Sequence, residues 1–357
     1  MKKLDLYIIK QFIGTYVFSI ILILSIAVVF DLTEKMDDFF ESGATVEDII
    51  TKYYFNFFPF YMNMFSSLFV FISVIFFTSK LAGNSEIIAM LSGGVSYHRI
   101  MLPYFISAFF IFSLSFYLGG YVIPGATKEM LDFENEYIKK FKTDNARNVQ
   151  MEIEPGVIFY IESYQSKSNR GYRFSLETFN GKSLISRLTA DRIRWVKDYT
   201  WTAENYLIRR FVGMREEIEK GSRLDTVIMV QPEEFYVTAR ESAQMSNPDL
   251  VKYLEKQSKR GVGNIQAFQN EYYKRWASPL AAFIMTLIGV SLSSQKVRGG
   301  MGLNLGVGIA LSAIYILFST ISSSFAVNGS MSPFMATWLP NFIFLGIGIF
   351  LYIRAPK

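Results

Sequence analysis

Six long stretches without a charged residue constrain this chain more than any other feature of its sequence. As helices, they are long enough to cross the ~30 Å hydrocarbon core of a membrane, which takes about 20 residues. The chain is also 51% hydrophobic and holds 34 Phe and 21 Tyr, more apolar content than one soluble domain needs. We therefore predict a multi-pass helical membrane protein with spans at Phe12–Phe30, Phe57–Ser79, Leu102–Ile123, Trp276–Ser294, Gly302–Val327 and Phe334–Ile353.

The first stretch, Phe12–Phe30, could also be the apolar core of a signal peptide. It is longer than a typical signal core, and no small-x-small cleavage site follows it. We interpret it as an uncleaved span. An acidic stretch follows, in which Thr45 with Asp48 three residues later predicts the start of a helix that leads to the second span.

The distribution of Lys and Arg predicts the orientation of the spans. If the N-terminus is cytoplasmic, the short outside loops hold only Lys35 and Lys52. The inside segments are then much more basic, with Lys2, Lys3, Lys10, Lys80, Arg99, Lys296, Arg298, Arg354 and Lys357. We expect both termini in the cytoplasm and the polar stretch between the third and fourth spans outside.

That polar stretch has the pattern of an antiparallel β-domain. Tyr172–Phe179 and Leu184–Val196 flank Asn180-Gly181, a strong signal for a two-residue hairpin. Several strands without intervening helices favour a sandwich or a jellyroll-like fold. Helical signals return at Asn247 and Pro248. The predicted fold is six transmembrane helices with a β-jellyroll-like domain inserted between helices three and four. Its parts are residues 1–123 (spans one to three), 124–245 (β-domain), 246–275 (connecting helices) and 276–357 (spans four to six).

Residues suited to enzyme chemistry are scarce. The chain has no Cys and a single histidine, His98, so we exclude thiolate and His-rich metal sites. Gly181-Lys182-Ser183 looks like the end of a phosphate loop, but Leu176 stands where the first glycine belongs, and we interpret the segment as a turn. The uncharged spans argue against proton or sodium coupling. We expect a non-enzymatic chain without a cofactor, driven through a cytoplasmic partner.

Asn84–Arg99, between the second and third spans, is the best candidate to receive that energy. It predicts a short helix with Asn84 or Ser85 as the N-cap, Glu86 in the first turn and Gly93-Gly94 as the stop. Ile87, Met90 and Leu91 share one face by their spacing. This face either packs on the protein's own helices or fills a groove in a partner. The other cytoplasmic loop, Gln295–Met301, is short and glycine-rich.

Several motifs resemble the lipopolysaccharide-export permeases of the LptF/LptG family. Ser85-Glu86-Ile87-Ile88-Ala89-Met90 followed by Gly94-Val95-Ser96 is similar to the family's cytoplasmic coupling segment. Leu250 to Gly261 resembles its helix after the β-domain. Lys274-Arg275-Trp276-Ala277-Ser278-Pro279-Leu280 resembles its entry into span four, and Trp338-Leu339-Pro340-Asn341 its signature in span six. The order of spans and β-domain agrees along nearly the whole chain.

The resemblance implies a set of partners. Such permeases pair as a twelve-span heterodimer and bind a cytoplasmic ATPase dimer, which holds the ATP and Mg. They extract lipopolysaccharide from the inner membrane of a Gram-negative bacterium. The periplasmic β-domain passes it to a bridge joined by a single-span partner. The resemblance places ATPase coupling on Ser85, Glu86, Ile87, Met90, Leu91 and Gly94.

Candidate substrate contacts follow from lipid A being anionic and acylated, which calls for apolar walls and cations near the outer headgroups. Spans one and five line the cavity in the family, so Phe18 and Ile314 are candidates there. Lys35 is the nearest basic residue to the outer end of span one. Lys274 and Arg275 lie near the outer end of span four, where snorkelling alone also explains them. Gly302, Gly306 and Gly308 suit either close helix packing or a moving gate.

Two alternatives stay open on the sequence. The chain could be a permease that moves another lipid or a lipoprotein by a mechanical stroke. It could also be a membrane scaffold that presents a β-domain without moving any substrate. A scaffold should tolerate the loss of Glu86, whereas a transporter driven through the coupling segment should not.

Overall fold

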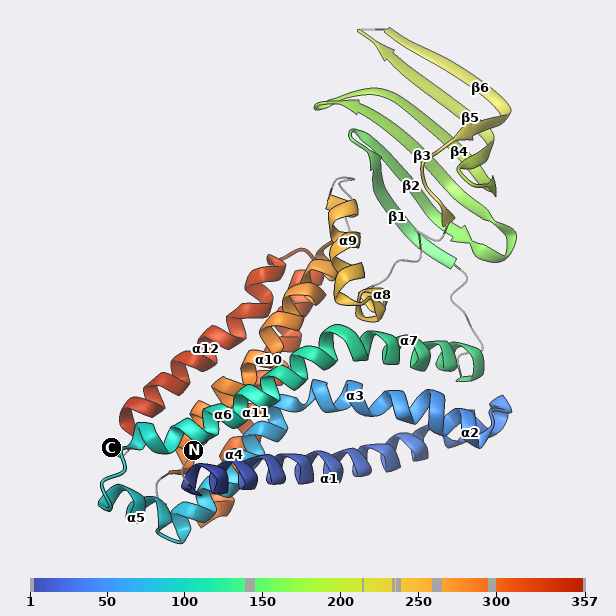
Figure 1. Cartoon of the computed structure of the whole chain (residues 1–357). Coiled ribbons are helices and arrows are strands. Elements are labelled where there is room, and N and C mark those ends of the chain that lie inside the picture. Colours follow the sequence, from blue (N-terminus) through green and yellow to red (C-terminus); the bar gives the residue numbers. More distant parts are fainter. Residues whose placement is uncertain are drawn as a thin grey trace. The chain divides into compact units, whose positions relative to one another are not determined.

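The computed structural model describes residues 3–138, 145–213, 215–232, 235, 239–258, 265–294 and 300–355 (Figure 1). The chain forms two compact units, each described here by itself. The first, a helical unit, comprises residues 1–138, 243–247 and 269–357, and the second, a β-unit, comprises residues 139–242 and 248–268. The predicted loop Gln295–Met301 lies largely outside the described residues.

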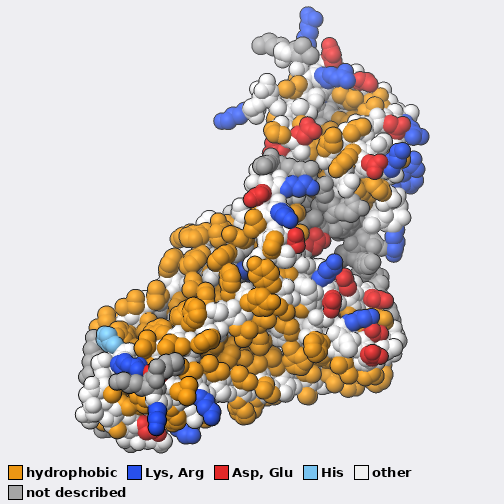
Figure 2. All heavy atoms as spheres, in the orientation of Figure 1, with side chains coloured by type: hydrophobic (Ala, Val, Ile, Leu, Met, Phe, Trp, Pro, Cys, Tyr) orange, Lys and Arg blue, Asp and Glu red, His pale blue; other side chains and the backbone are white. Residues whose placement is uncertain are grey.

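Among the described residues, six helical segments are long and apolar enough to cross a membrane, which confirms the predicted number of spans. They contain α1 (Lys3–Ser42), α4 (Ser66–Gly83), α6 (Tyr97–Tyr117), α10 (Ile265–Ser293), α11 (Gly300–Val327) and α12 (Pro333–Arg354). Orange hydrophobic side chains cover most of the visible surface of this unit (Figure 2). A surface of this kind is stable in lipid and not in water.

Two glycines and one asparagine account for close contacts between the spanning helices. A side chain at Gly289 of α10 would lie 2.8 Å from Val74 of α4, and one at Gly308 of α11 would overlap Ile75. Small residues therefore let these backbones approach closely. Asn341 of α12 donates to the carbonyl of Ala277 (2.7 Å) and accepts from the Tyr315 hydroxyl (2.8 Å). For Gly308 the packing interpretation holds, whereas Gly302 and Gly306 have open space around them.

The first helix is longer than a membrane is thick. Its 40 residues span about 60 Å at 1.5 Å per residue, roughly twice the hydrocarbon core. The last turns of α1 lie beside α3 and α7 (Figure 1), and the three enclose a small aromatic core of their own. That core consists of Phe39, Tyr53, Tyr54, Phe57, Met130 and Phe133. The segments around it are α2 (Val46–Asp48), η1 (Ile49–Tyr54), α3 (Phe55–Met64), η2 (Leu118–Val122), α7 (Ile123–Phe133) and η3 (Glu134–Ile138). We call this part the distal end of the unit.

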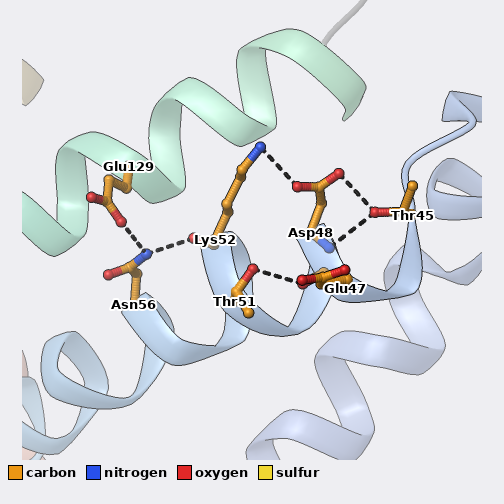
Figure 3. A network of polar contacts seen from close by, with 7 residues as sticks. All are labelled: Thr45, Glu47, Asp48, Thr51, Lys52, Asn56 and Glu129. Carbon is orange, nitrogen blue, oxygen red and sulfur yellow. Dashed lines mark hydrogen bonds and ion pairs between the residues drawn. The ribbon is translucent and has the colours of Figure 1, made fainter.

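Polar contacts tie the exposed side of the distal end together (Figure 3). The Thr45 hydroxyl accepts from the backbone N–H of Asp48 at 3.1 Å, which confirms the predicted helix start. Lys52 pairs with Asp48 at 2.7 Å one turn away. Asn56 donates to Glu129 of α7 at 2.9 Å, so the network links two segments far apart in the sequence.

The β-unit is an antiparallel sheet whose described strands follow one another in chain order. The predicted hairpin is confirmed, but its two-residue turn is Gly181-Lys182, one residue later than predicted, because Asn180 still pairs with Ser183. Gly181 has a φ of +61°. Each described strand pairs with the next one along the chain, so the described strands form one antiparallel sheet, which confirms the predicted β-domain between the third and fourth spans. Tight turns impose this order, including one at Gly156 that the sequence analysis missed. The strands are β1 (Asn145–Glu154), β2 (Val157–Gln165), β3 (Arg170–Asn180), β4 (Ser183–Lys197), β5 (Thr200–Val212) and β6 (Arg215–Val227).

A row of irregular residues crosses the whole sheet. Asn148 of β1, Arg173 of β3 and Asn205 of β5 have φ values of 52°, 52° and 55°. The strand registers place them in one row with Glu162, Asp191 and Ser222 of the intervening strands. The register is the same on both sides of this row, so the left-handed residues interrupt the strand pairing without adding a residue. The row therefore crosses all six strands at the same level.

One face of the sheet carries the core of the β-unit. Trp201 is buried, and its indole N–H donates to the carbonyl of Val230 at 3.1 Å. Phe159, Tyr164 and Phe235 pack around it. Helix α9 (Asn247–Ser258) follows α8 (Ala239–Gln244) and buries Leu250, and the Tyr253 ring packs on Phe268 at 4.4 Å. The predicted helix at Asn247 is thereby confirmed.

Candidate functional site

The predicted coupling segment forms a short helix, α5 (Glu86–Ser92), between α4 and α6. Its end follows the prediction. Gly94 has a φ of +82°, and the N–H groups of Gly94 and Val95 donate to the carbonyls of Leu91 (3.0 Å) and Met90 (3.1 Å). This is the Schellman arrangement, in which a left-handed glycine satisfies the last carbonyls of a helix.

Ser85, one of the two predicted candidates, occupies the N-cap position, but not in the conformation expected of a capping residue. Ser85 has a φ of 63° and its side chain makes no capping bond. Asn84 instead donates to the Glu86 carboxylate at 3.1 Å. The reason is the abrupt change of direction after α4, which forces Ser85 into the left-handed region, whereas an N-cap needs an extended backbone to reach the helix N–H groups. Glu86 is held half-exposed at the start of α5.

The apolar face of α5 points inward. Ile87 is only 3% exposed, and Met90 and Leu91 pack against the same core as the spanning helices. The outward side of the helix carries Ile88, which is 53% exposed, next to the exposed Ala89. A short helix is stable only when one face is buried, and the chain's own core covers that face here. The surface available to a partner is therefore Glu86, Ile88 and Ala89, and the sequence analysis did not single out Ile88. Its position, about 160° around the helix from Met90, was the signal.

Lys35 lies within a cluster that already neutralises it. Its amine pairs with Asp31 (3.0 Å) and Glu134 (3.6 Å) and donates to the Tyr53 hydroxyl. Tyr53 and Tyr54 also donate to Asp31 at 3.2 and 3.3 Å. Burial, together with the two carboxylates, raises the pKa of the Tyr53 phenol. One cation beside two anions does not favour a further anion.

Arg275 is also engaged within the chain. It is buried, pairs with Glu271 at 3.0 Å, and donates to the Met245 carbonyl (2.8 Å) and to Asn247 (2.9 Å). These bonds join the start of α9 to α10. Breaking a buried arginine ion pair is costly. The stability that these bonds provide is therefore enough to account for an arginine at this position.

Lys274 has a different environment. It is exposed and lines a hollow of 330 Å³ with residues from the end of α11, namely Ser319, Thr320, Ser323, Ser324, Val327 and Asn328. Within the part of the chain that the structure describes, it makes no ion pair. The Thr320 and Ser324 hydroxyls donate to carbonyls of their own helix, so the donors left to face the hollow are the Lys274 ammonium, the Asn328 amide and the other two serine hydroxyls. Of the three predicted basic residues, Lys274 is the one whose charge is unpaired among the described residues.

Phe18 of α1 and Ile314 of α11 are both exposed on the outer surface of the helical unit. Similar exposed side chains follow them along each helix, with Ile21 and Leu22 on α1 and Leu317 and Ile321 on α11. The two helices thus present apolar faces to lipid or to another chain. Among the described residues, no three His, Cys, Asp or Glu side chains gather to hold a metal.

The match to a known family covers almost the entire chain. The family model described as "Lipopolysaccharide export system permease LptF/LptG" matches residues 6–354. The chain belongs to this family. The match includes the six candidate spans, α5 and the sheet, so the LptF/LptG assignment applies to both units. No curated protein matches the chain. Family membership supports a role as a permease in lipopolysaccharide export, and the helices make the chain a multi-pass membrane protein.

Proposed function

We propose that this chain is the membrane-spanning subunit of an ATP-driven exporter that takes lipopolysaccharide out of the inner membrane. A separate cytoplasmic ATPase dimer supplies the energy, and the chain itself is not catalytic. A second six-span permease completes the membrane path. The β-unit lies in the periplasm and hands the substrate to a bridge joined by a single-span partner. Both termini lie in the cytoplasm.

The observation that carries the proposal is the geometry of α5. Its inner face is anchored in the core through Ile87, so a force on its outer face acts on the spanning helices. That outer face offers an apolar side chain, Ile88, beside the carboxylate of Glu86. A helix binds a partner's groove through exposed apolar side chains, and Ile88 is such a side chain here, with Glu86 able to pair with a cation beside the groove. Ser85 and Gly94 set the start and end of this helix.

The substrate surfaces follow from chemistry. Acyl chains suit the apolar faces that carry Phe18 and Ile314, and the anionic headgroup suits the hollow at Lys274. A photo-crosslinker at Phe18 or Ile314 should capture lipopolysaccharide in native membranes. Capture of ordinary phospholipid only would favour a permease for another lipid.

The ATPase contact has a matched pair of variants. Ile88→Asp should release the ATPase in co-purification, because it puts a charge on the docking face. Ile50→Asp should leave the complex intact, since Ile50 is equally exposed (55% against 53%) but lies at the distal end. Glu86→Lys should weaken the complex as well. Undiminished recovery of the ATPase with both Ile88→Asp and Glu86→Lys would overturn the proposal.

The chain lacks cysteine, which permits a direct test of its orientation. Ser92 of α5 and Ser222 of β6 are both exposed. A membrane-impermeant maleimide added outside spheroplasts should label Ser222→Cys and spare Ser92→Cys until the membrane is opened. The reverse pattern would contradict the proposed topology.

A further inference from the structure

Three consecutive residues in the first turn of α6 contact three different helical segments. The Tyr97 hydroxyl lies 3.3 Å from the Ser294 hydroxyl, directly after α10. A ring nitrogen of His98 lies 2.9 Å from the Tyr352 hydroxyl of α12. Arg99 donates to Asp5 of α1 at 2.7 Å. Successive residues in a helix are rotated by about 100°, so one turn can reach three neighbours.

This turn is joined closely to α5. Gly93–Ser96 is the connection between α5 and α6, and the bonds that end α5 hold it in shape. Val95 packs against the core between them, and the N–H of Arg99 donates to the Ser96 carbonyl at 3.0 Å. Because this connection is short and is held by hydrogen bonds, a displacement of α5 would move the first turn of α6 with it.

The bond from Arg99 to Asp5 differs from the other contacts of α1 in this region. Asp5 has a side chain only 5% exposed, and that of Arg99 is 33% exposed. An ion pair with one buried member is directional and costly to break. The other contacts described for this part of α1 are apolar or aromatic, such as Phe12 with Tyr104 at 6.1 Å between ring centroids, and such contacts are not directional. A cation in the first turn of a helix is also unfavourable for the helix dipole, so helix stability does not explain Arg99.

We infer that the first turn of α6 is a transmission junction, in which Arg99 and Asp5 pass the movement of α5 to α1. Both act as positioning residues. Because α1 carries Phe18 on its outer face, a shift of α1 moves a surface offered to the substrate. The inference rests on the proposed function, since it requires an ATPase that acts on α5.

The test compares ATP hydrolysis with lipopolysaccharide release in the complex purified from native membranes and placed in vesicles. Asp5→Asn removes the charge and keeps the shape. It should leave ATPase binding and hydrolysis near the unaltered level and lower lipopolysaccharide released per ATP about fivefold or more, the lower range of typical coupling between sites. Lys10→Gln is the matched control, because Lys10 is an exposed charge on the same end of α1. It should change neither quantity.

Two further variants keep the result interpretable. The exchange Asp5→Arg with Arg99→Asp restores a pair of opposite charges and should recover much of the release per ATP. A crosslink between Asp5→Cys and Arg99→Cys by a short bis-maleimide should do the same, since the chain has no other cysteine. Unchanged release per ATP in Asp5→Asn would overturn the junction. So would a parallel fall in thermal stability, hydrolysis and release, which marks a purely structural role. Failure of the unaltered complex to bind any ATPase would instead overturn the proposed function.

Discussion

The two ends of α1 are held in different ways. At the distal end, Lys35 and Asp31 lie within a dense cluster of buried rings and several hydrogen bonds. At the other end, α1 packs on α4 and α6 through apolar and aromatic side chains, and the ion pair between Asp5 and Arg99 also joins it to the turn that follows α5. Close packing resists a change of shape at both ends, and only the first turns of α1 add a charged, directional contact to the turn after α5 among the described residues. The difference suggests that α1 is fixed distally and driven from its first turn.

The largest expected effect tests whether the distal end is a static core. Phe133→Ala removes a buried ring, which contacts Phe39, Tyr53 and Tyr137, and should lower the free energy of unfolding by about 3–5 kcal/mol. Denaturant unfolding in detergent measures this. The exposed Phe30→Ala should cost less than about 0.5 kcal/mol. If surviving Phe133→Ala protein also lost lipopolysaccharide release per ATP, as expected for Asp5→Asn, the contrast between the two ends would fail.

Removing the cation at the distal end should have the second largest effect on the free energy of unfolding. Lys35→Met leaves Asp31 and Glu134 without their shared partner and should lower stability by about 1–3 kcal/mol at neutral pH, since the cluster is only partly exposed. The deficit should shrink in acid, where protonated carboxylates no longer repel each other. Unfolding midpoints at two pH values measure it. An anion-binding role for Lys35 predicts a different result, namely loss of lipopolysaccharide crosslinking with stability unchanged.

Removing the Tyr53 hydroxyl should lower the free energy of unfolding moderately, by an amount that depends on pH. Tyr53→Phe keeps the ring and loses the bond to Asp31, which should cost about 1 kcal/mol below pH 10. The pKa of the Tyr53 phenol is raised in the folded protein. Its contribution is therefore complete below the ordinary tyrosine pKa of about 10 and is lost as the pH rises above it. The unaltered protein should lose stability at alkaline pH more steeply than Tyr53→Phe. Parallel curves would show that burial does not hold the phenol protonated.

The smallest expected effect is that of a His98 variant, which separates the contacts made by the first turn of α6. His98→Gln keeps a polar side chain, and His98 is exposed, so stability should change by less than about 0.5 kcal/mol. Lipopolysaccharide release per ATP should fall much less than in Asp5→Asn, because the contact with Tyr352 carries no opposite charge. Equal losses in the two variants would assign the junction to all three bonds rather than to Arg99.

The sequence by itself determined the features that depend on local chemistry. Uncharged runs such as Gly302–Val327 predicted the spans, because a bare backbone in lipid must form helices. The run Phe57–Ser79 is divided at Phe65, and the spanning helix there is Ser66–Gly83. Asn180-Gly181 predicted its hairpin and Gly94 the end of α5, because few other residues adopt the left-handed backbone found there. The motifs around Glu86 pointed to the LptF/LptG family, which the family match confirms.

The tertiary structure alone decided which groups meet. The periodicity of α5 identified an apolar face, but only the fold showed that Ile87 is covered by the chain's own core and that Ile88 remains outside. Lys35 and Lys274 look alike in the sequence, yet one is neutralised and the other lines a hollow. Asp5 and Arg99 are far apart along the chain, and so are the six residues of the row that crosses the sheet. Local sequence limits the conformations of each segment, whereas burial and charge pairing depend on neighbours that only folding brings into contact.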